Sequence, residues 1–231
     1  MYYFGLDIYY FVLIIPCIIL AAVAQGQVSA TFKKYSAVRT RRGITAEQAA
    51  QRVLSANGVT GVQIQRVSGN LTDHYDPRTN VIRLSDTVYG SQSVAAVGVA
   101  AHEAGHAVQY AKQYAPIKIR AAIIPITNIG SNLSWPLILI GLIFNSSPLL
   151  LTGILFFSFS TVFQLITLPV ELNASGRAIR ALSDGGILYE EEVPMAKKTL
   201  RAAAMTYVAA LAVSIAQLLR LLLIFGGRRR D

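Results

Sequence analysis

The chain has 231 residues, of which 53% are hydrophobic and 14% are charged, and its mean hydropathy is +0.46. This composition excludes an ordinary soluble domain, and the length leaves too little sequence for several domains. The single cysteine, Cys17, excludes an intramolecular disulfide. We therefore expect one integral membrane domain over residues 1–231.

The first apolar segment, residues 6–24, is long enough to cross a bilayer. Only Asp7, near its edge, and Pro16 interrupt it. A cleaved signal peptide is the competing interpretation, but residues 1–5 carry no positive charge and Ala22–Ala24 is a weak cleavage signal. We therefore predict an uncleaved membrane anchor.

The next part of the chain has the texture of a small soluble α+β segment. Thr45 is a plausible N-cap, and Gln48 three residues later predicts a capping box for a helix over 46–56. Alternating apolar and polar residues predict short strands at 62–67 and 81–84. A small sheet is therefore expected.

Between these strands, residues 71–77 contain the third histidine, His74, together with two aspartates and a proline. The segment could line a substrate cleft or simply close a hairpin. Because Asp, Asn and Pro are ordinary turn residues, the spacing alone favours a turn.

The most informative pattern is the run His102-Glu103-Ala104-Gly105-His106, which contains two of the three histidines. On a helix, positions 102 and 106 lie on one face about one turn apart, so both imidazoles can reach one metal ion. In this HExxH motif the histidines bind zinc and the glutamate serves as general base of a metalloprotease. An amphipathic helix with two hydrogen-bonded histidines is the alternative.

The context of the motif is helical, because no proline occurs from Val94 to Ala115. Small residues surround the histidines, among them Ala104 and Gly105. They would either let a substrate backbone approach the metal or allow close packing against a neighbouring membrane helix. Both explanations can hold on different faces of the helix. We assign residues 25–114 as the catalytic segment.

Three further apolar spans are expected, at 117–144, 149–170 and 202–225. The second and third form a helical hairpin. Arg220 interrupts the last span near its end, where its long side chain could extend toward the lipid headgroups.

Basic residues flank the spans and account for much of the net charge of +9. Those that follow the first span are Lys33, Lys34, Arg39, Arg41 and Arg42. The positive-inside rule places residues 25–114 in the cytoplasm, and it places the basic segment 171–201 there as well. Arg228–Arg230 conflict with this arrangement, because four crossings would put them outside. Basic residues in this distribution favour anionic lipid headgroups and do not indicate nucleic acid binding.

A catalytic zinc site usually has a third protein ligand. The candidates are His74, Asp184, the run Glu190–Glu192, and Glu171. Glu171 is the best placed, because it stands where the third span emerges on the side assigned to the catalytic segment, and it would open a helix there. A buried carboxylate needs a cation partner, which a metal would provide. An ion pair with Arg177 or Arg180 is the alternative.

The chain resembles the YugP-like neutral zinc metallopeptidases, a family of bacterial membrane proteins, over nearly its whole length. The segments that carry the resemblance are Ser36-Ala-Val-Arg39, Leu71-Thr-Asp-His-Tyr-Asp-Pro-Arg78, Ile82-Arg-Leu-Ser85, Ser93-Val-Ala-Ala96, Val99-Ala-Ala-His-Glu-Ala-Gly-His-Ala107 and Glu171-Leu-Asn-Ala-Ser175. The resemblance implies a peptidase related to the membrane gluzincins. It implies one Zn²⁺ bound by His102, His106 and Glu171, with Glu103 as general base.

The resemblance also gives weight to His74 and Tyr75, which we expect to contact substrate or stabilise the oxyanion. Membrane gluzincins often carry an aspartate four residues after the ligand glutamate, and here that position is Ser175, with Asn173 between them. A hydroxyl or an amide can still orient a ligand, although the charge is missing.

These patterns predict a mainly α-helical membrane protein with about four transmembrane helices and a small cytoplasmic zincin-like α+β segment. The predicted function is a zinc-dependent endopeptidase that hydrolyses peptide bonds through a metal-activated water. Its partners would be a peptide or protein substrate, the lipid bilayer and an unidentified membrane protein, in the plasma membrane of a bacterium. A non-catalytic zinc-binding scaffold that recruits a protein is the alternative, and a metal transporter is a weaker one.

Overall fold

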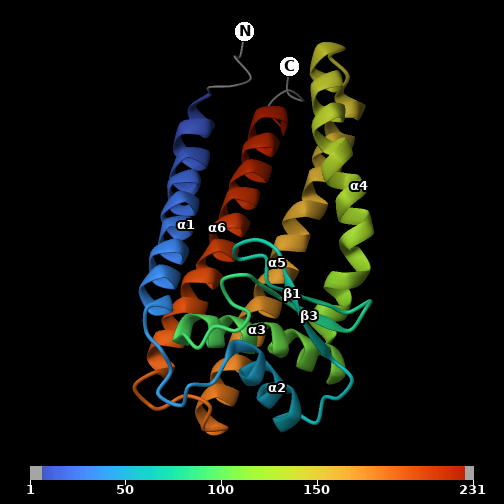
Figure 1. Ribbon diagram of the computed structural model, residues 1–231. Helices are drawn as coiled ribbons and strands as arrows, with labels where there is room; N and C mark the ends of the chain where they lie inside the picture. Colours follow the sequence, from blue (N-terminus) through green and yellow to red (C-terminus); the bar gives the residue numbers. More distant parts are fainter. Residues whose placement is uncertain (1–6, 227–231) are drawn as a thin grey trace. The chain divides into compact units, whose positions relative to one another are not determined.

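A computed structural model of the chain describes residues 7–226 (Figure 1). Residue 6, with which the first predicted span begins, and Arg228–Arg230 lie outside the described residues. The elements in chain order are η1 (Tyr10–Ile14), α1 (Ile15–Ser36), α2 (Ala46–Ala56), β1 (Gln63–Val67), β2 (His74–Asp76), β3 (Val81–Ser85), α3 (Val94–Ala111), α4 (Ala115–Ile143), α5 (Ser147–Asp184) and α6 (Val193–Gly226).

Within the described part of the chain, four helices are long and apolar enough to cross a membrane: η1 together with α1, and α4, α5 and α6. The remaining elements form a small α+β segment. The predicted fold class, a mainly α membrane protein with a small α+β segment, is therefore confirmed.

The chain divides into two compact units. Among the described residues, the first unit comprises 7–24, 119–169 and 206–226, and the second comprises 25–118 and 170–205. The helices α1, α4, α5 and α6 contribute residues to both units.

In the first unit, small residues let apolar helices come close together. A Cβ added at Gly153 on α5 would lie 2.9 Å from the backbone nitrogen of Ile138 and 2.9 Å from the carbonyl oxygen of Ser134, both on α4. The hydroxyls of Ser131 and Ser160 also form a hydrogen bond of 2.7 Å between these helices. Such close packing and interhelical hydrogen bonding are typical of helix association in membranes.

An ion pair joins the beginning of the first helix to the last helix of the same unit. The guanidinium of Arg220 donates to Asp7 Oδ2 from Nε at 3.0 Å and from a terminal nitrogen at 2.5 Å. Arg220 is 4% exposed and also lies over the ring of Tyr10, 5.3 Å from its centroid. The side chain of Arg220, which we expected to extend toward the lipid headgroups, is thus paired with the carboxylate of Asp7.

The first helix begins with the π-helical turn η1, immediately before Pro16. The N–H of Ile15 bonds to the carbonyl of Tyr10, five residues earlier. Because Pro16 has no N–H, the regular pattern of helical hydrogen bonds lacks one bond directly after this turn. The helix then continues to Ser36, twelve residues beyond the predicted apolar span 6–24.

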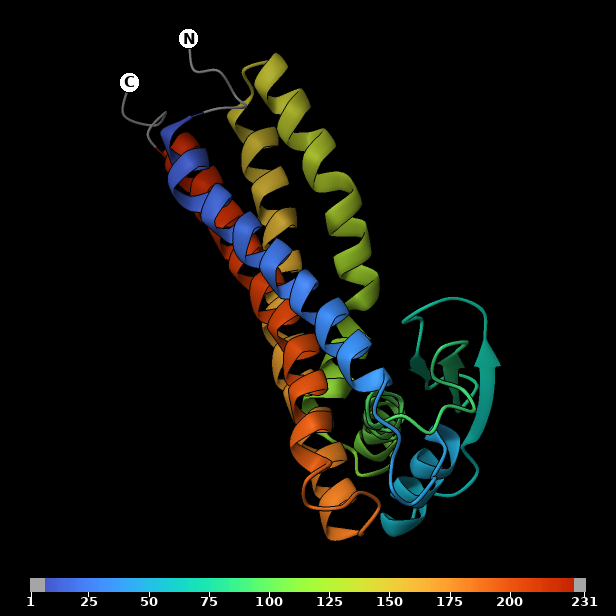
Figure 2. The ribbon, with the colours of Figure 1, turned by 60° about the vertical axis from the view of Figure 1, so that its left-hand side comes forward.

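In the second unit, α2 and a three-stranded sheet pack on the buried helix α3. Figure 2 shows α3 nearly end-on, with α2 and the strands on one side of it. The predicted capping box at Thr45 is confirmed, because its hydroxyl accepts from the N–H of Gln48 and the Gln48 side chain accepts from Thr45. The core of this unit is largely alanine and valine, which allows close approach of its elements.

The sheet has the order β1-β3-β2, with β1 parallel and β2 antiparallel to β3. The preference for a turn around His74 was wrong in this respect, since residues His74–Asp76 form an edge strand. The chain turns afterwards, at residues 77–80, where Asn80 has a φ of 55°. Three residues are too few for a clear alternation, so the sequence pattern did not distinguish this strand from a turn.

Helix α5 runs without interruption from Ser147 to Asp184 and passes through Pro169. Glu171 therefore lies inside a long helix, whereas we expected a new helix to begin there. Proline can remain inside an apolar helix when neighbouring groups satisfy the freed backbone. The arrangement gives Glu171 a rigid support.

Candidate metal centre

Helix α3 holds the HExxH residues in a buried setting. Its N-cap is Ser93, whose hydroxyl accepts from the N–H of Ala96 at 3.2 Å. Glu103 and His106 are each 8% exposed. Burial of two polar side chains this close together on one helix is costly unless they have partners, so the contacts around them define the site.

Glu171 on α5 meets both histidines of α3. Its Oε2 lies 3.3 Å from Nε2 of His102 and 3.5 Å from Nε2 of His106. One ligand atom from each of the three residues lies within 4.8 Å of the others, and Glu171 is 2% exposed. Among the described residues, this is the one cluster of at least three His, Cys, Asp or Glu side chains with such spacing.

Gln109, one turn after His106, fixes the orientation of that imidazole. The Gln109 amide nitrogen donates to the carbonyl of Val170 at 2.8 Å and to Oδ1 of Asn173 at 3.0 Å. Its amide oxygen must therefore face Nδ1 of His106, at 3.0 Å, and accept a hydrogen bond from the N–H at that atom. The proton on Nδ1 leaves Nε2 of His106 free as a ligand atom, directed at Glu171.

Other residues of α5 complete the surroundings of the histidines. Nδ1 of His102 lies 3.1 Å from the hydroxyl of Ser175, which therefore contacts the other imidazole. Asn173 accepts a second hydrogen bond, from Nε of Arg177 at 2.8 Å, in addition to that from Gln109. The hydroxyl of Ser175 thus contacts His102 from the position where membrane gluzincins often carry an aspartate, and Asn173 contacts Gln109, the partner of His106.

Gly105 allows α3 and α5 to approach closely enough for these contacts. A Cβ added there would lie 2.7 Å from the carbonyl oxygen of Ala174, which is flanked by Asn173 and Ser175. Of the two explanations for the small residues, close helix packing therefore applies at Gly105.

The negative charge at the cluster favours a cation. Burial lowers the pKa of His106, but the hydrogen bond to Glu171 and the charges of Glu103 and Glu171 outweigh burial and raise this pKa above its ordinary value. Since one kind of cation, the proton, is stabilised here, the same charges would stabilise a metal ion.

The other sequence candidates lie elsewhere. His74 is exposed on β2, where its Nδ1 bonds the carbonyl of Thr72 at 2.8 Å. Asp184 is exposed at the end of α5. Glu192 is 3% exposed and accepts from the backbone N–H of Arg41 at 2.7 Å. Acidic runs of this kind are ordinarily solvated, but Glu192 is buried where the loop after α1 meets the start of α6.

Tyr75 lies on the opposite face of β2 from His74, by the alternation of a strand. Its ring centroid lies 5.7 Å from that of Tyr110 on α3, and its hydroxyl donates to Oδ1 of Asn80 at 2.7 Å. The roles of His74 and Tyr75 toward substrate stay predictions.

Comparison with known proteins identifies the family of the chain. The family model described as "Putative neutral zinc metallopeptidase" matches residues 10–226. The chain belongs to this family. It is also 43% identical over 208 residues to "Putative membrane protease YugP" of Bacillus subtilis (strain 168), which covers 90% of this chain and 92% of that protein. No solved structure matches the chain.

The residues present fit the zinc that the name of the metallopeptidase family implies. Two imidazole nitrogens and one carboxylate oxygen are a donor set that zinc accepts in catalytic sites. The set leaves room in the coordination sphere for water or substrate, as a hydrolytic metallopeptidase requires. His102, His106 and Glu171 would be the ligands.

Gln109, whose amide oxygen faces the candidate ligand His106, was not predicted from the sequence as part of the site. The sequence indicates this contact only through the position of Gln109, three residues after His106 on the same helix. A polar residue with no contact to the site could equally occupy that position. We expect Gln109→Leu to weaken zinc binding about 10–100-fold, the range for loss of a group that orients a ligand histidine. Competition with a chromophoric chelator would measure this, with the exposed Gln51→Leu on α2 as control. Equal affinities of the two variants would refute the role.

Proposed function

We propose that this family member is a membrane-embedded zinc endopeptidase. The observation that carries the proposal is the convergence of His102, His106 and Glu171 on a common position, with Glu103 on the same buried helix. Membership in a zinc metallopeptidase family supports a peptide substrate, and the four apolar helices support insertion in a lipid bilayer.

In the proposed reaction, Glu103 accepts a proton from the attacking water and later delivers it to the leaving amine. When bound, zinc supplies Lewis acidity, which makes water nucleophilic near neutral pH and polarises the peptide carbonyl. Gln109 and Ser175 hold the two imidazoles in orientation throughout. The burial of Glu103 limits competing contacts with solvent.

An extended substrate segment would bind along β2. This strand pairs with β3 on one side and is one of the two edge strands of the described sheet. A segment that pairs with such an edge gains main-chain hydrogen bonds without a demand for a particular sequence. Of the two side chains on β2 that we expected to contact substrate, Tyr75 is better placed than His74, because its ring approaches Tyr110 of the HExxH helix.

We propose that the protein resides in a bacterial plasma membrane with the metal centre at the cytoplasmic face. The support is the set of basic residues at the end of α1 and in the loop that follows it. The membrane orientation of this face would be checked by labelling single cysteines in intact cells.

The purified full chain tests the enzymatic proposal. We expect it to cleave an unfolded substrate such as casein, to lose this activity with the zinc chelator 1,10-phenanthroline, and to regain it when zinc is restored. Each step follows from a requirement for the ion in the reaction. Bound zinc without cleavage of any unfolded substrate would instead support the non-catalytic scaffold that recruits a protein partner.

A further inference from the structure

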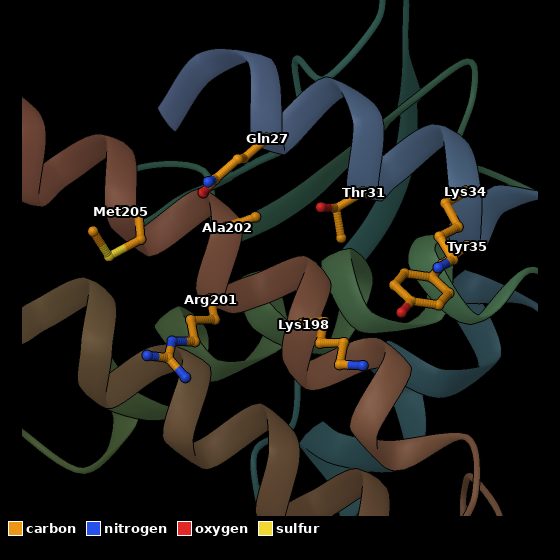
Figure 3. Close-up of a pocket in the computed structure, with 8 residues that line it drawn as sticks. All are labelled: Gln27, Thr31, Lys34, Tyr35, Lys198, Arg201, Ala202 and Met205. Atoms are coloured by element: carbon orange, nitrogen blue, oxygen red, sulfur yellow. The ribbon is translucent and has the colours of Figure 1, made fainter. Parts of the chain in front are cut away.

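A groove of about 510 Å³ lies between the second half of α1 and the first turns of α6, within the second unit (Figure 3). Its lining residues are Gln27, Thr31, Lys34 and Tyr35 of α1, and Lys198, Arg201, Ala202 and Met205 of α6. The spacing of each set is that of one helical face. None of these residues belongs to the candidate metal centre.

The groove is strongly basic. Lys34, Lys198 and Arg201 line it, and no aspartate or glutamate does. Within residues 7–226, none of the three cations has an ion-pair partner. Lys34 lies above the ring of Tyr35, 5.6 Å from its centroid. Like charges that share a concave site repel one another, so a bound anion would be favourable there.

Polar groups that can accept or donate hydrogen bonds stand beside these cations. Figure 3 shows Gln27 and Thr31 on α1 facing the α6 side of the groove, with Lys34 and Tyr35 further along the same helix. Lys198 extends from α6 below them. The lysines, the arginine and the threonine of the groove are hydrogen-bond donors. A phosphate ester has several oxygens that can accept from them at the same time.

The groove lies where two apolar helices become polar. In α1 the apolar residues precede Gln27, and in α6 the long apolar stretch follows Met205. Both helices are candidate membrane spans, so the groove residues lie next to the apolar part of each span. Phosphates of lipid headgroups lie at this boundary, and basic pockets between membrane helices bind them.

We propose that this groove is a binding site for a phosphate ester, and that the headgroup of an anionic phospholipid supplies it. Lys34, Lys198 and Arg201 bind the phosphate, and Gln27 and Thr31 contact the polar remainder of the headgroup. The site is separate from the peptidase chemistry, so its test does not depend on whether the protein cleaves peptides.

Native mass spectrometry of the full chain, released from detergent with defined lipids, tests the site. The variant K34Q/K198Q removes two groove cations, and the control K33Q/K197Q removes two exposed lysines that neighbour them in sequence but do not line the groove. Both variants change the net charge equally. We expect phosphatidylglycerol to bind in preference to phosphatidylcholine, and K34Q/K198Q to weaken this binding roughly tenfold or more, with a much smaller effect of the control.

A second arm uses inorganic phosphate and glycerol 1-phosphate as competitors. If these soluble ions do not displace phosphatidylglycerol from the native chain, the result supports a lipid as the source of the phosphate. If they displace it from the native chain but have no such effect on K34Q/K198Q, the groove also binds a soluble phosphate. Equal lipid binding by K34Q/K198Q and K33Q/K197Q would overturn the proposal, as would equal retention of the two lipids by the native chain. Size-exclusion chromatography shows whether each variant is folded. If the double variant folds poorly, the single variant R201Q provides the same comparison of lipid binding.

Discussion

Replacement of Glu103 by glutamine is expected to abolish proteolysis while zinc remains bound. Glutamine has nearly the same shape, so the buried position beside His102 and His106 stays filled. It cannot accept the proton of the attacking water, and loss of a general base typically lowers the rate about 10²–10⁴-fold. Cleavage rates and metal content, measured on the same preparation, test both halves of the expectation.

The control for this substitution is Glu190→Gln, which makes the same chemical change at an exposed position before α6. It should retain both activity and zinc. A Glu103→Gln protein as active as this control would refute the assignment of the base, and a Glu103→Gln protein without zinc would show that the carboxylate contributes to metal binding.

Replacement of Gly105 by alanine is expected to remove both zinc and activity, although Gly105 contributes no functional group. The new Cβ would lie 2.7 Å from the carbonyl oxygen of Ala174, and backbone atoms cannot move aside as a flexible side chain would. Helix α5 must shift, and with it Glu171 and Ser175. Overpacking typically costs about 1–3 kcal/mol, and a displacement of about 1 Å in a site can lower the rate about 10²-fold.

Helix α3 offers a matched control for this experiment at Gly98. A Cβ there would lie 3.4 Å from Cβ of Ala196 on α6, which is an ordinary contact. Gly98→Ala should therefore retain zinc and activity, so the comparison separates the effect of helix spacing from that of helix propensity. Equal zinc content of the two variants would contradict the close approach of α3 and α5 as the basis of the site.

Local features were predictable from the sequence, because their causes lie within one or two helical turns. The placement of His102 and His106 on one face and the capping box at Thr45 are of this kind. Glu171 could be proposed from its place at the end of an apolar span, although its helix begins much earlier than expected.

Features that depend on distant contacts were not predictable. Gln109 acquires its role from Val170 and Asn173, which are 61 and 64 residues away in the chain. The strand β2 is only three residues long and depends on its pairing with β3. In both cases the local sequence is compatible with a simpler explanation, and only the tertiary contact decides.

The pairing of Asp7 with Arg220 has a consequence for biosynthesis. The two residues are 213 positions apart, so at 5–20 residues per second the ribosome adds the arginine roughly 10–40 s after the aspartate. Throughout this interval the carboxylate of Asp7 lacks the guanidinium that neutralises it in the folded protein, and water is its most favourable surrounding. We therefore expect the first helix to reach its final depth late, when the segment that carries Arg220 enters the membrane.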